Sequence, residues 1–327
     1  MKALVIGYGS IGKRHIQNLS ELDGISITVC TNRKIDTYLK KQKCKIIKNL
    51  ENCLTSSFDF AIISNESNLH ANTALILAQK KIPFIIEKPL SHEMKNVKQL
   101  INLVKKNNLI TLMGCNLRFH PCIKKIKYLI NENKIGKIHS VKVENGSYLP
   151  DWHSSENYQK SYASRKELGG GVVLTSIHEI DYLYWFFGDV NEVVSMNGKF
   201  SNLKINVDDL SSSLLLFKNN FISELHLDYF QHFPFRSCKI IGEKGIIYWD
   251  TEINCVKIFN PKTKRWKKEF SLINYNFDST YKEELKYFLN CLKNNNQSMN
   301  SVEDGFVVLQ IALAILRSSK IKKAVQL

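Results

Sequence analysis

The first third of the chain alternates short apolar runs with segments whose apolar side chains recur at helical spacing. In segment 11–22, for example, Ile11, His15 and Leu19 fall on one helical face. The expected strands are 3–6, 25–30, 58–64, 84–87 and 109–115, and the expected helices are 11–22, 69–81 and 92–107. Strands that alternate with helices at this period predict a parallel sheet with right-handed crossovers.

The pattern changes after about residue 120, where strand-like segments follow one another with short turns between them. The expected strands are 138–148, 190–200, 211–217, 221–230, 236–241, 245–250 and 256–260, and the expected helices are 123–131, 171–187, 281–293 and 302–318. Successive strands predict a mostly antiparallel sheet. We therefore expect two domains, an α/β domain over 1–118 and an α+β domain over 119–327. A sheet covered by helices on one face must bury its other face, so we expect a homodimer or homotetramer formed through the second sheet.

Composition agrees with two ordinary globular domains. The chain has 327 residues, of which 44% are hydrophobic and 23% are charged, and this excludes wholesale disorder. The longest apolar run, 306–316, is shorter than the ~20 residues that a membrane span needs. The apolar start 3–6 is too short for a signal peptide. These features predict a cytoplasmic protein without a membrane partner.

The chain is basic, with 46 Lys and Arg against 30 Asp and Glu and a net charge of +16. The lysines are spread along the chain, as in 40–45 and 262–268, and no nucleic-acid motif accompanies them. This distribution favours a lysine-rich surface or an anionic small-molecule ligand, and we expect no nucleic-acid partner. Eight cysteines include no CxxC pair and none lies beside a histidine at metal-ligand spacing, which favours reduced thiols and no metal site.

The first apolar run leads directly into Gly7-Tyr8-Gly9-Ser10-Ile11-Gly12, which fits the GxGxxG pattern of a Rossmann fold. The three glycines allow a tight turn, a close approach of a pyrophosphate and close packing of helix on strand. The helix that follows offers unpaired N–H groups to the phosphates. Because this pattern lies within a strand–turn–helix unit, it predicts a dinucleotide site.

The second strand indicates which dinucleotide is bound. NAD-specific sites usually carry an acidic residue about 20 residues after the glycines, where it binds the ribose hydroxyls. Here the strand ends in Thr31, with Arg33 and Lys34 close behind, and no acidic residue stands at that tip. Hydroxyl and cationic groups suit a 2′-phosphate, so NADP(H) is favoured. Asp36 is near enough to leave NAD(H) open.

Further features follow in the order typical of one family. They are Ile63-Ser64-Asn65 with His70 five residues on, Glu87-Lys88-Pro89 after a strand, Asn116-Leu117-Arg118-Phe119-His120-Pro121, and Gly169-Gly170-Gly171 with His178-Glu179-Ile180-Asp181. Over essentially its whole length the chain resembles the glucose–fructose oxidoreductase/inositol dehydrogenase (Gfo/Idh/MocA) family. Stretches such as NLRFHP, YLPDWH and SRKELGGG are most similar to members associated with surface-polysaccharide or nine-carbon-sugar biosynthesis.

The resemblance implies an oxidoreductase that uses a nicotinamide cofactor on a carbon of a sugar or sugar derivative, possibly acidic or nucleotide-activated. By position, Lys88 would be the catalytic residue that stabilises charge on the reacting oxygen. Glu87 would position the nicotinamide riboside, and Pro89 would shape the turn that directs Lys88. His178 would be the second catalytic residue and would exchange a proton with the substrate hydroxyl.

The chain departs from the family at one position, because members commonly carry an Asp three or four residues before the histidine. Here Leu174 and Thr175 occupy those positions, and Thr175 can form a hydrogen bond but carries no charge. Two alternatives to sugar oxidoreduction therefore stay open. One is reduction of a C=N bond, and the other is a cofactor-binding regulatory or structural protein with reduced catalysis.

The remaining candidates lie near strand ends or in the loop before the glycine triplet. Ser64 and Asn65 end a strand where a dinucleotide would lie, and Arg118 could hold a carboxylate or phosphate or form a structural ion pair. Glu179 and Asp181 are expected to be structural. The cofactor-binding candidates are Gly7, Gly9, Ser10, Ile11, Gly12, Thr31, Arg33, Lys34, Ser64, Asn65, His70, Glu87, Lys88 and Asn116. The substrate-binding candidates are Arg118, Trp152, His153, Tyr158, Arg165, Thr175 and His178.

Overall fold

The structure, a computed structural model, describes residues 1–34, 36–42, 44–152 and 157–327. The chain forms two units. The first unit comprises Met1–Asn116 and Asp278–Phe306, and the second comprises Leu117–Phe277 and Val307–Leu327.

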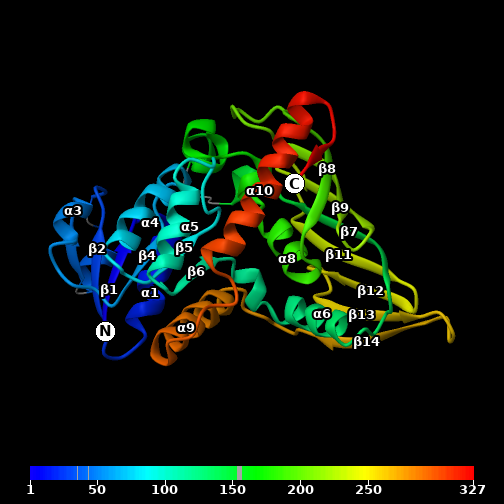
Figure 1. Cartoon of the computed structure of the whole chain (residues 1–327), viewed down its shortest axis with the longest axis horizontal. Coiled ribbons are helices and arrows are strands. Elements are labelled where there is room, and N and C mark those ends of the chain that lie inside the picture. Colours follow the sequence, from blue (N-terminus) through cyan, green and yellow to red (C-terminus); the bar gives the residue numbers. More distant parts are fainter. Residues whose placement is uncertain (35, 43, 153–156) are drawn as a thin grey trace. The chain divides into compact units, whose positions relative to one another are not determined.

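The first unit is built on a parallel sheet with the strand order β3-β2-β1-β4-β5-β6 (Figure 1). Its strands are β1 Lys2–Ile6, β2 Ser26–Cys30, β3 Lys45–Ile47, β4 Phe60–Ile63, β5 Phe84–Glu87 and β6 Thr111–Gly114. Its helices include α1 Ser10–Ser20, α2 Thr37–Lys41, α3 Leu50–Cys53, α4 His70–Gln79 and α5 Val97–Lys106. Every residue of β4 and β5 is buried, as expected for central strands covered on both faces. The predicted Rossmann fold is confirmed. The strand order changes direction between β1 and β4, and a Rossmann fold binds its dinucleotide at the carboxyl ends of the strands at that point.

A segment from far along the chain completes this unit. Helix α9, Ser279–Asn294, buries Leu285, Phe288 and Cys291 in the same core as β1 and β4. The ring of Phe288 meets that of Phe60 edge-on, with 5.9 Å between centroids. The predicted division placed this helix in the second domain. Local sequence patterns do not reveal which core a returning helix joins, because that depends on contacts between distant residues.

The second unit contains a nine-stranded sheet with the order β14-β13-β12-β11-β7-β10-β9-β8-β15. Its strands are β7 Ile138–Gly146, β8 Val190–Gly198, β9 Leu210–Phe217, β10 Phe221–Asp228, β11 Phe235–Gly242, β12 Gly245–Asp250, β13 Cys255–Asn260, β14 Arg265–Ser271 and β15 Val325–Gln326. All neighbouring pairs are antiparallel except β7 with β10, which are parallel. The predicted, mostly antiparallel sheet is therefore confirmed.

Helices pack against one face of this sheet. Helix α6, Pro121–Asn131, contacts β13 and β14, and α8, His178–Phe187, contacts β7. Both lie on the same side of the strands (Figure 1). The other face exposes apolar side chains, including Val194, Met196 and Leu214.

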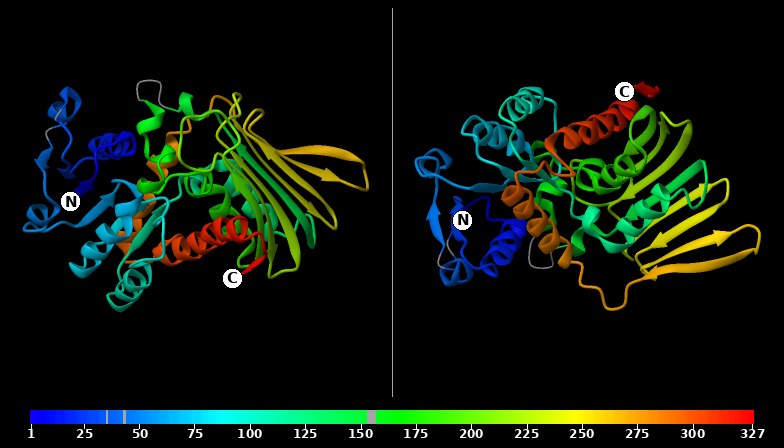
Figure 2. Two further views of the ribbon diagram at one scale, coloured as in Figure 1. Left: turned by 90° about the horizontal axis from the view of Figure 1, so that it is seen from above. Right: turned by 60° about the horizontal axis from the view of Figure 1, so that its bottom comes forward.

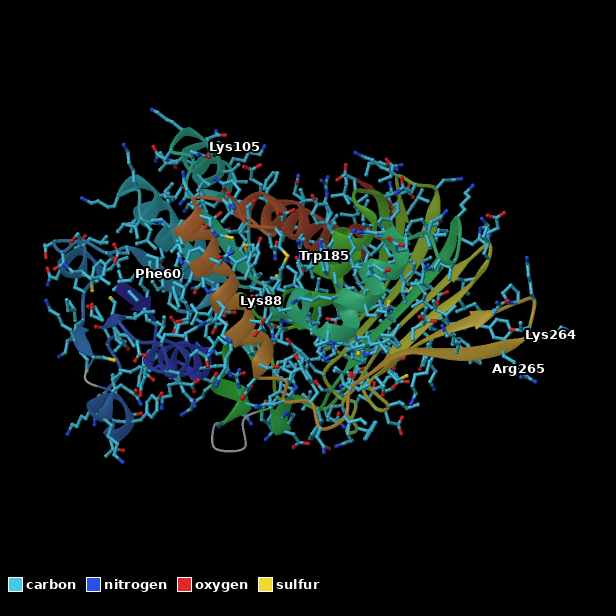
Figure 3. All side chains as sticks on the ribbon, turned by 90° about the horizontal axis from the view of Figure 1, so that it is seen from below. Phe60, Lys88, Lys105, Trp185, Lys264 and Arg265 are labelled. Carbon is cyan, nitrogen blue, oxygen red and sulfur yellow. The ribbon has the colours of Figure 1, made fainter. Side chains whose placement is uncertain are left out.

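Several elements differ from the sequence prediction. The predicted helix over 171–187 is divided into α7, Val172–Thr175, and α8. The prediction missed α2, β3 and α3, which are only three to five residues long, and it missed β14. Strand β14 begins with Arg-Trp-Lys-Lys, and these four residues are exposed. It forms a hairpin with β13 that projects from the sheet (Figure 2), with Lys264 and Arg265 at the far end (Figure 3).

Helix α10, Val302–Ile321, is the longest helix in the part of the chain that the structure describes. Neither it nor any other described helix combines the length and apolar character that a bilayer crossing requires.

Candidate functional site

The glycine turn after β1 has an unfilled space at one of its three glycines. A Cβ atom on Gly7, whose φ is +102°, would lie 2.5 Å from the backbone of Ser64 and Asn65. One on Gly12 would lie 2.4 Å from the carbonyl oxygen of Gly7. A Cβ on Gly9 would meet no atom within 4 Å, and its φ of −87° suits any residue. Packing within the protein thus requires Gly7 and Gly12 but not Gly9, and the open space fits a bound group.

The start of α1 suits an anion. Gly9 is the N-cap residue, so no side chain caps the first N–H groups of the helix, and no acidic residue stands in its first turn. Ser10 is exposed and Ile11 is partly exposed. Uncapped N–H groups together with the positive end of the helix dipole favour a phosphate. The candidates Gly7, Gly9, Ser10, Ile11 and Gly12 therefore form one site that fits a pyrophosphate.

This geometry gives a testable prediction for Gly9. Gly9→Ala should leave the melting temperature unchanged but weaken cofactor binding about tenfold or more, because the methyl group occupies only the open space. Gly12→Ala is the matched control, since its methyl group meets backbone and should cost about 1–3 kcal/mol of stability. Fluorescence titration and thermal unfolding measure the two effects. Equal cofactor affinity in Gly9→Ala and the unmodified protein would contradict this placement of the pyrophosphate.

The loop after β2 contains an acidic residue that is already held by the protein. Asp36 accepts hydrogen bonds from the Tyr8 hydroxyl at 2.7 Å, Lys13 Nζ at 2.8 Å and the Leu39 amide at 2.9 Å. The hydrogen bond from Lys13, followed by that from Tyr8, holds the pKa of Asp36 well below its ordinary value. The carboxylate is thus engaged at the N-terminus of α2.

The residues before Asp36 differ in exposure. Thr31 is buried and its hydroxyl accepts a hydrogen bond from the Arg33 amide at 3.1 Å. The side chains of Arg33 and Lys34 are exposed, and neither forms an ion pair within the described residues. The loop therefore presents two cationic side chains to solvent, while its carboxylate is held by Tyr8 and Lys13.

Two candidates follow β4. The Ser64 hydroxyl is buried and donates to the carbonyl oxygens of Ile6 and Gly7, so it supports the glycine turn. The amide of Asn65 donates to Thr73 at 3.0 Å. Its Oδ1 is buried and has no hydrogen-bond partner among the described residues. A buried acceptor of this kind fits a donor group on a ligand.

The end of β5 carries Glu87 and Lys88. Glu87 is buried, and its Oε1 lies 2.6 Å from Nε2 of the buried His15 on α1. The absence of a side chain at Gly114 leaves room for this carboxylate, since a Cβ there would lie 2.9 Å from Glu87 Oε2. Lys88 follows and is partly exposed (Figure 3). Its peptide bond to Pro89 is cis. Glu87 thus has an internal partner that fixes the end of the strand just before Lys88.

Two further cofactor candidates are buried against other parts of the first unit. The amide of Asn116 donates to the Thr280 hydroxyl of α9 at 2.8 Å. His70 begins α4 and is 1% exposed, and its ring nitrogens face the carbonyl oxygens of Pro89 and Asn65. These contacts connect both residues to the protein itself.

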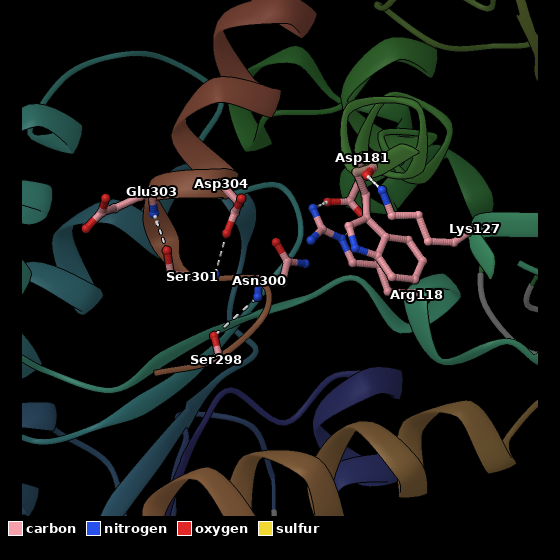
Figure 4. A network of polar contacts seen from close by, with 9 residues as sticks. Arg118, Lys127, Asp181, Ser298, Asn300, Ser301, Glu303 and Asp304 are labelled. Atoms are coloured by element: carbon pink, nitrogen blue, oxygen red, sulfur yellow. Dashed lines mark hydrogen bonds and ion pairs between the residues drawn. The ribbon is translucent and has the colours of Figure 1, made fainter. Parts of the chain in front are cut away.

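In the second unit, Arg118 forms a buried ion pair. Its Nε and Nη2 donate to the two carboxylate oxygens of Asp181 at 2.9 and 2.8 Å, and both side chains are 1% exposed (Figure 4). The guanidinium also lies 5.5 Å from the centroid of the Trp185 ring. The structure thus shows the ion pair that the sequence left open for Arg118. Asp181 acts structurally, as does Glu179, which pairs with Arg236 at 2.5 Å.

The region around Thr175 contains a residue that the sequence did not single out. Tyr229, at the end of β10, is buried beside Thr175 and Trp152. Burial raises the pKa of Tyr229 well above its ordinary value, and a hydrogen bond with Thr175 acts in the opposite direction. The Trp152 ring meets the Tyr229 ring edge-on, with 5.4 Å between centroids. Thr175 is thus buried close to a phenol that the sequence analysis did not single out.

The catalytic candidate His178 is the first residue of α8 and is partly exposed. Helix α7 ends at Thr175 and α8 begins at His178, so the two residues do not share the one continuous helix that was predicted.

The other substrate-binding candidates lie in the loop before the glycine triplet. Tyr158 accepts a hydrogen bond from the Lys204 amide at 3.3 Å, and Arg165 pairs with Glu167 at 2.6 Å. The candidate His153 lies outside the described residues.

The sequence analysis did not predict that His15 contacts Glu87, that Asp36 is held by Tyr8 and Lys13, or that Tyr229 packs against Trp152. Each acts through a partner that is distant in the chain, and no local motif marks such a partner. Among the described residues, no group of three His, Cys, Asp or Glu side chains is arranged to hold a metal ion.

Two family models match successive parts of the chain. The model of an oxidoreductase family with an NAD-binding Rossmann fold matches residues 1–115, and that of the GFO/IDH/MocA C-terminal domain matches residues 123–248. Myo-inositol 2-dehydrogenase of Thermotoga maritima is 24% identical over 100% of this chain and 98% of its own. Levoglucosan dehydrogenase of Pseudarthrobacter phenanthrenivorans is 33% identical over 41% of this chain and 35% of its own. A solved levoglucosan dehydrogenase in complex with NADH shares the fold with a TM-score of 0.90 at 18% identity, covering 100% of this chain and 98% of that one.

Proposed function

The chain belongs to the Gfo/Idh/MocA family of oxidoreductases, and from this premise we propose that it transfers a hydride between a nicotinamide cofactor and a carbon of a sugar or sugar derivative. One observation supports this most directly. Gly9 leaves open space at the uncapped start of α1, at the strand edge where a Rossmann fold binds a dinucleotide. The names of the relatives, which include inositol and levoglucosan dehydrogenases, support a polyol or sugar substrate.

The first unit contains the groups that would hold the cofactor. The N–H groups at the start of α1 would bind the pyrophosphate, and Asn65 Oδ1 would accept a hydrogen bond from a hydroxyl or amide of the cofactor. When bound, the cofactor accepts or supplies the hydride at its nicotinamide ring.

The family resemblance implies a separate role for Lys88, in the first unit, and for His178, in the second unit. The ammonium group of Lys88 stabilises negative charge as it develops on the substrate oxygen. His178 accepts or returns the hydroxyl proton, since an imidazole titrates near neutral pH. Leu174 and Thr175 stand four and three residues before His178, so proton transfer here proceeds without a carboxylate at either position.

Absorbance of the reduced nicotinamide provides the test. The purified protein, checked for bound cofactor, is incubated with NAD⁺ or NADP⁺ and a panel that includes myo-inositol, levoglucosan, uronic acids and nucleotide sugars. Formation of reduced cofactor with one of these supports the proposal. Binding of cofactor with no turnover in either direction across the panel would instead favour a regulatory role.

We further propose that NADP(H) is the preferred cofactor. The exposed Arg33 and Lys34 offer two cationic groups to a 2′-phosphate, while Asp36 is already held by Tyr8 and Lys13. Arg33→Ala should weaken NADPH binding about tenfold and leave NADH binding unchanged, as expected for one charge-assisted contact. Lys40→Ala, at another exposed lysine, is the matched control for net charge. Tighter binding of NADH than NADPH by the unmodified protein would contradict this preference.

Two finer proposals concern partners. A net charge of +16 suits an acidic or nucleotide-activated sugar, which the basic surface would attract.

The exposed apolar side chains on the helix-free face of the second sheet support a homodimer or homotetramer formed through that face. They are Val194, Met196, Leu214 and Ile222.

A further inference from the structure

The two loops that follow β4 and β5 are joined by one buried side chain. His70 is 1% exposed. Its Nδ1 lies 2.7 Å from the carbonyl oxygen of Pro89, and its Nε2 lies 3.0 Å from the carbonyl oxygen of Asn65. Pro89 directly follows Lys88, and Asn65 carries the unpartnered buried oxygen at the cofactor edge. A single imidazole therefore connects the backbone of both loops.

The two contacts are not equivalent. A carbonyl oxygen can only accept, so each ring nitrogen must carry a proton in order to bond to it. Complete burial lowers the pKa of His70, although its hydrogen bonds to Pro89 and Asn65 act in the opposite direction. A neutral ring carries one proton. The contact from Nδ1 to Pro89 is the shorter of the two, at 2.7 Å against 3.0 Å for the contact from Nε2 to Asn65.

We propose that His70 is a positioning residue, which fixes Lys88 by holding the carbonyl oxygen of Pro89. This proposal gives His70 a role beside the expected contact with the cofactor, because both ring nitrogens face backbone of the protein. It rests on the proposed function in one respect, namely that turnover depends on Lys88. Small displacements of a reacting group reduce turnover strongly, by about 100-fold for about 1 Å.

Two substitutions separate the contacts. In His70→Asn the side-chain amide lies near the position of Nδ1 and can still donate to Pro89. In His70→Gln the amide lies near the position of Nε2 and can still donate to Asn65, but it leaves Pro89 unheld. We expect His70→Gln to lower kcat up to about 100-fold with an unchanged cofactor Kd. We expect His70→Asn to keep most of its kcat. Loss of a purely structural residue would lower stability and kcat alike in both variants.

A second measurement does not depend on turnover. Acetic anhydride modifies lysine amines, and mass spectrometry follows the peptide that contains Lys88. Bound cofactor should protect Lys88 in the unmodified protein and in His70→Asn, and this protection should fall in His70→Gln because Lys88 is no longer held in place. Thermal unfolding of each variant confirms that the protein is folded at the temperature of the acetylation experiment.

The outcomes are distinct. Reduced protection in His70→Gln alone supports the proposal. Equal protection in all three proteins overturns it, as does an equal loss in both variants. If the Lys88→Ala variant keeps full turnover, the proposed role of Lys88 in catalysis fails. The acetylation result still decides whether His70 positions Lys88.

Discussion

Lys88→Ala is expected to lower kcat about 10³-fold while the Kd of the cofactor stays within about threefold, because the variant loses charge stabilisation only as the reaction proceeds. In the proposed mechanism the ammonium of Lys88 acts on charge that develops on the substrate oxygen, and the groups that would hold the pyrophosphate lie at the start of α1. Steady-state kinetics with the reacting sugar and a separate cofactor titration measure the two quantities. The substitution removes no buried contact of Glu87, which keeps its partner His15.

Three controls strengthen this test. Lys80→Ala removes an exposed lysine at the end of α4 and should leave kcat unchanged. Lys88→Arg keeps the charge but changes its shape and reach, so it should be impaired less than the alanine variant. Added ethylamine should restore part of the activity of Lys88→Ala. An unchanged kcat in Lys88→Ala would contradict the catalytic role of Lys88.

The second large effect is expected for the buried pair of Arg118 and Asp181. Arg118→Met or Asp181→Leu alone should destabilise the protein by about 3–5 kcal/mol, because either change leaves an uncompensated charge in the interior. The double variant should recover most of this loss, since two apolar side chains of similar volume need no partner. Equilibrium unfolding in urea gives the four free energies of a double-mutant cycle.

An exposed pair provides the comparison. Lys218 and Asp189 also lie 2.8 Å apart, but their side chains are 59% and 50% exposed. Lys218→Met should change the free energy of unfolding by less than about 1 kcal/mol. If Arg118→Met were no more damaging than Lys218→Met, the pair with Asp181 would contribute little, and a ligand-binding role for Arg118 would regain support.

The fold was predictable because its signals are local. The strand Phe84–Glu87 was predicted with its observed bounds, since an apolar run between turns marks a buried strand. The glycine turn was also predictable, because the backbone geometry that needs Gly7 and Gly12 is set within one strand–turn–helix unit and its neighbouring strand. Strand β14, which was missed, carries charged side chains on both faces. Its backbone pairing with β13 defines it as a strand, and such pairing leaves no periodic pattern of apolar side chains in the sequence.

The site was predictable as a set of positions but not as a set of contacts. Lys88 and His178 could be located from motifs. The partner of Glu87 is His15, 72 residues earlier, and the partner of Arg118 is Asp181, 63 residues later. No local pattern links residues so far apart. The same limit explains why the contact between the His70 ring and the backbone of Pro89, 19 residues later, was not predicted.

The late return of α9 to the first unit has a consequence for protein synthesis. The core that receives Leu285 and Phe288 contains β1 and β4, which leave the ribosome before any residue of the second unit. At about 5–20 residues per second, about 8–30 s pass between the synthesis of Asn116 and that of Asp278. During this interval Phe60 and its apolar neighbours lack the helix that covers them. The nascent chain therefore exposes this apolar surface until α9 has been synthesised, and only then can the core of the dinucleotide fold be completed.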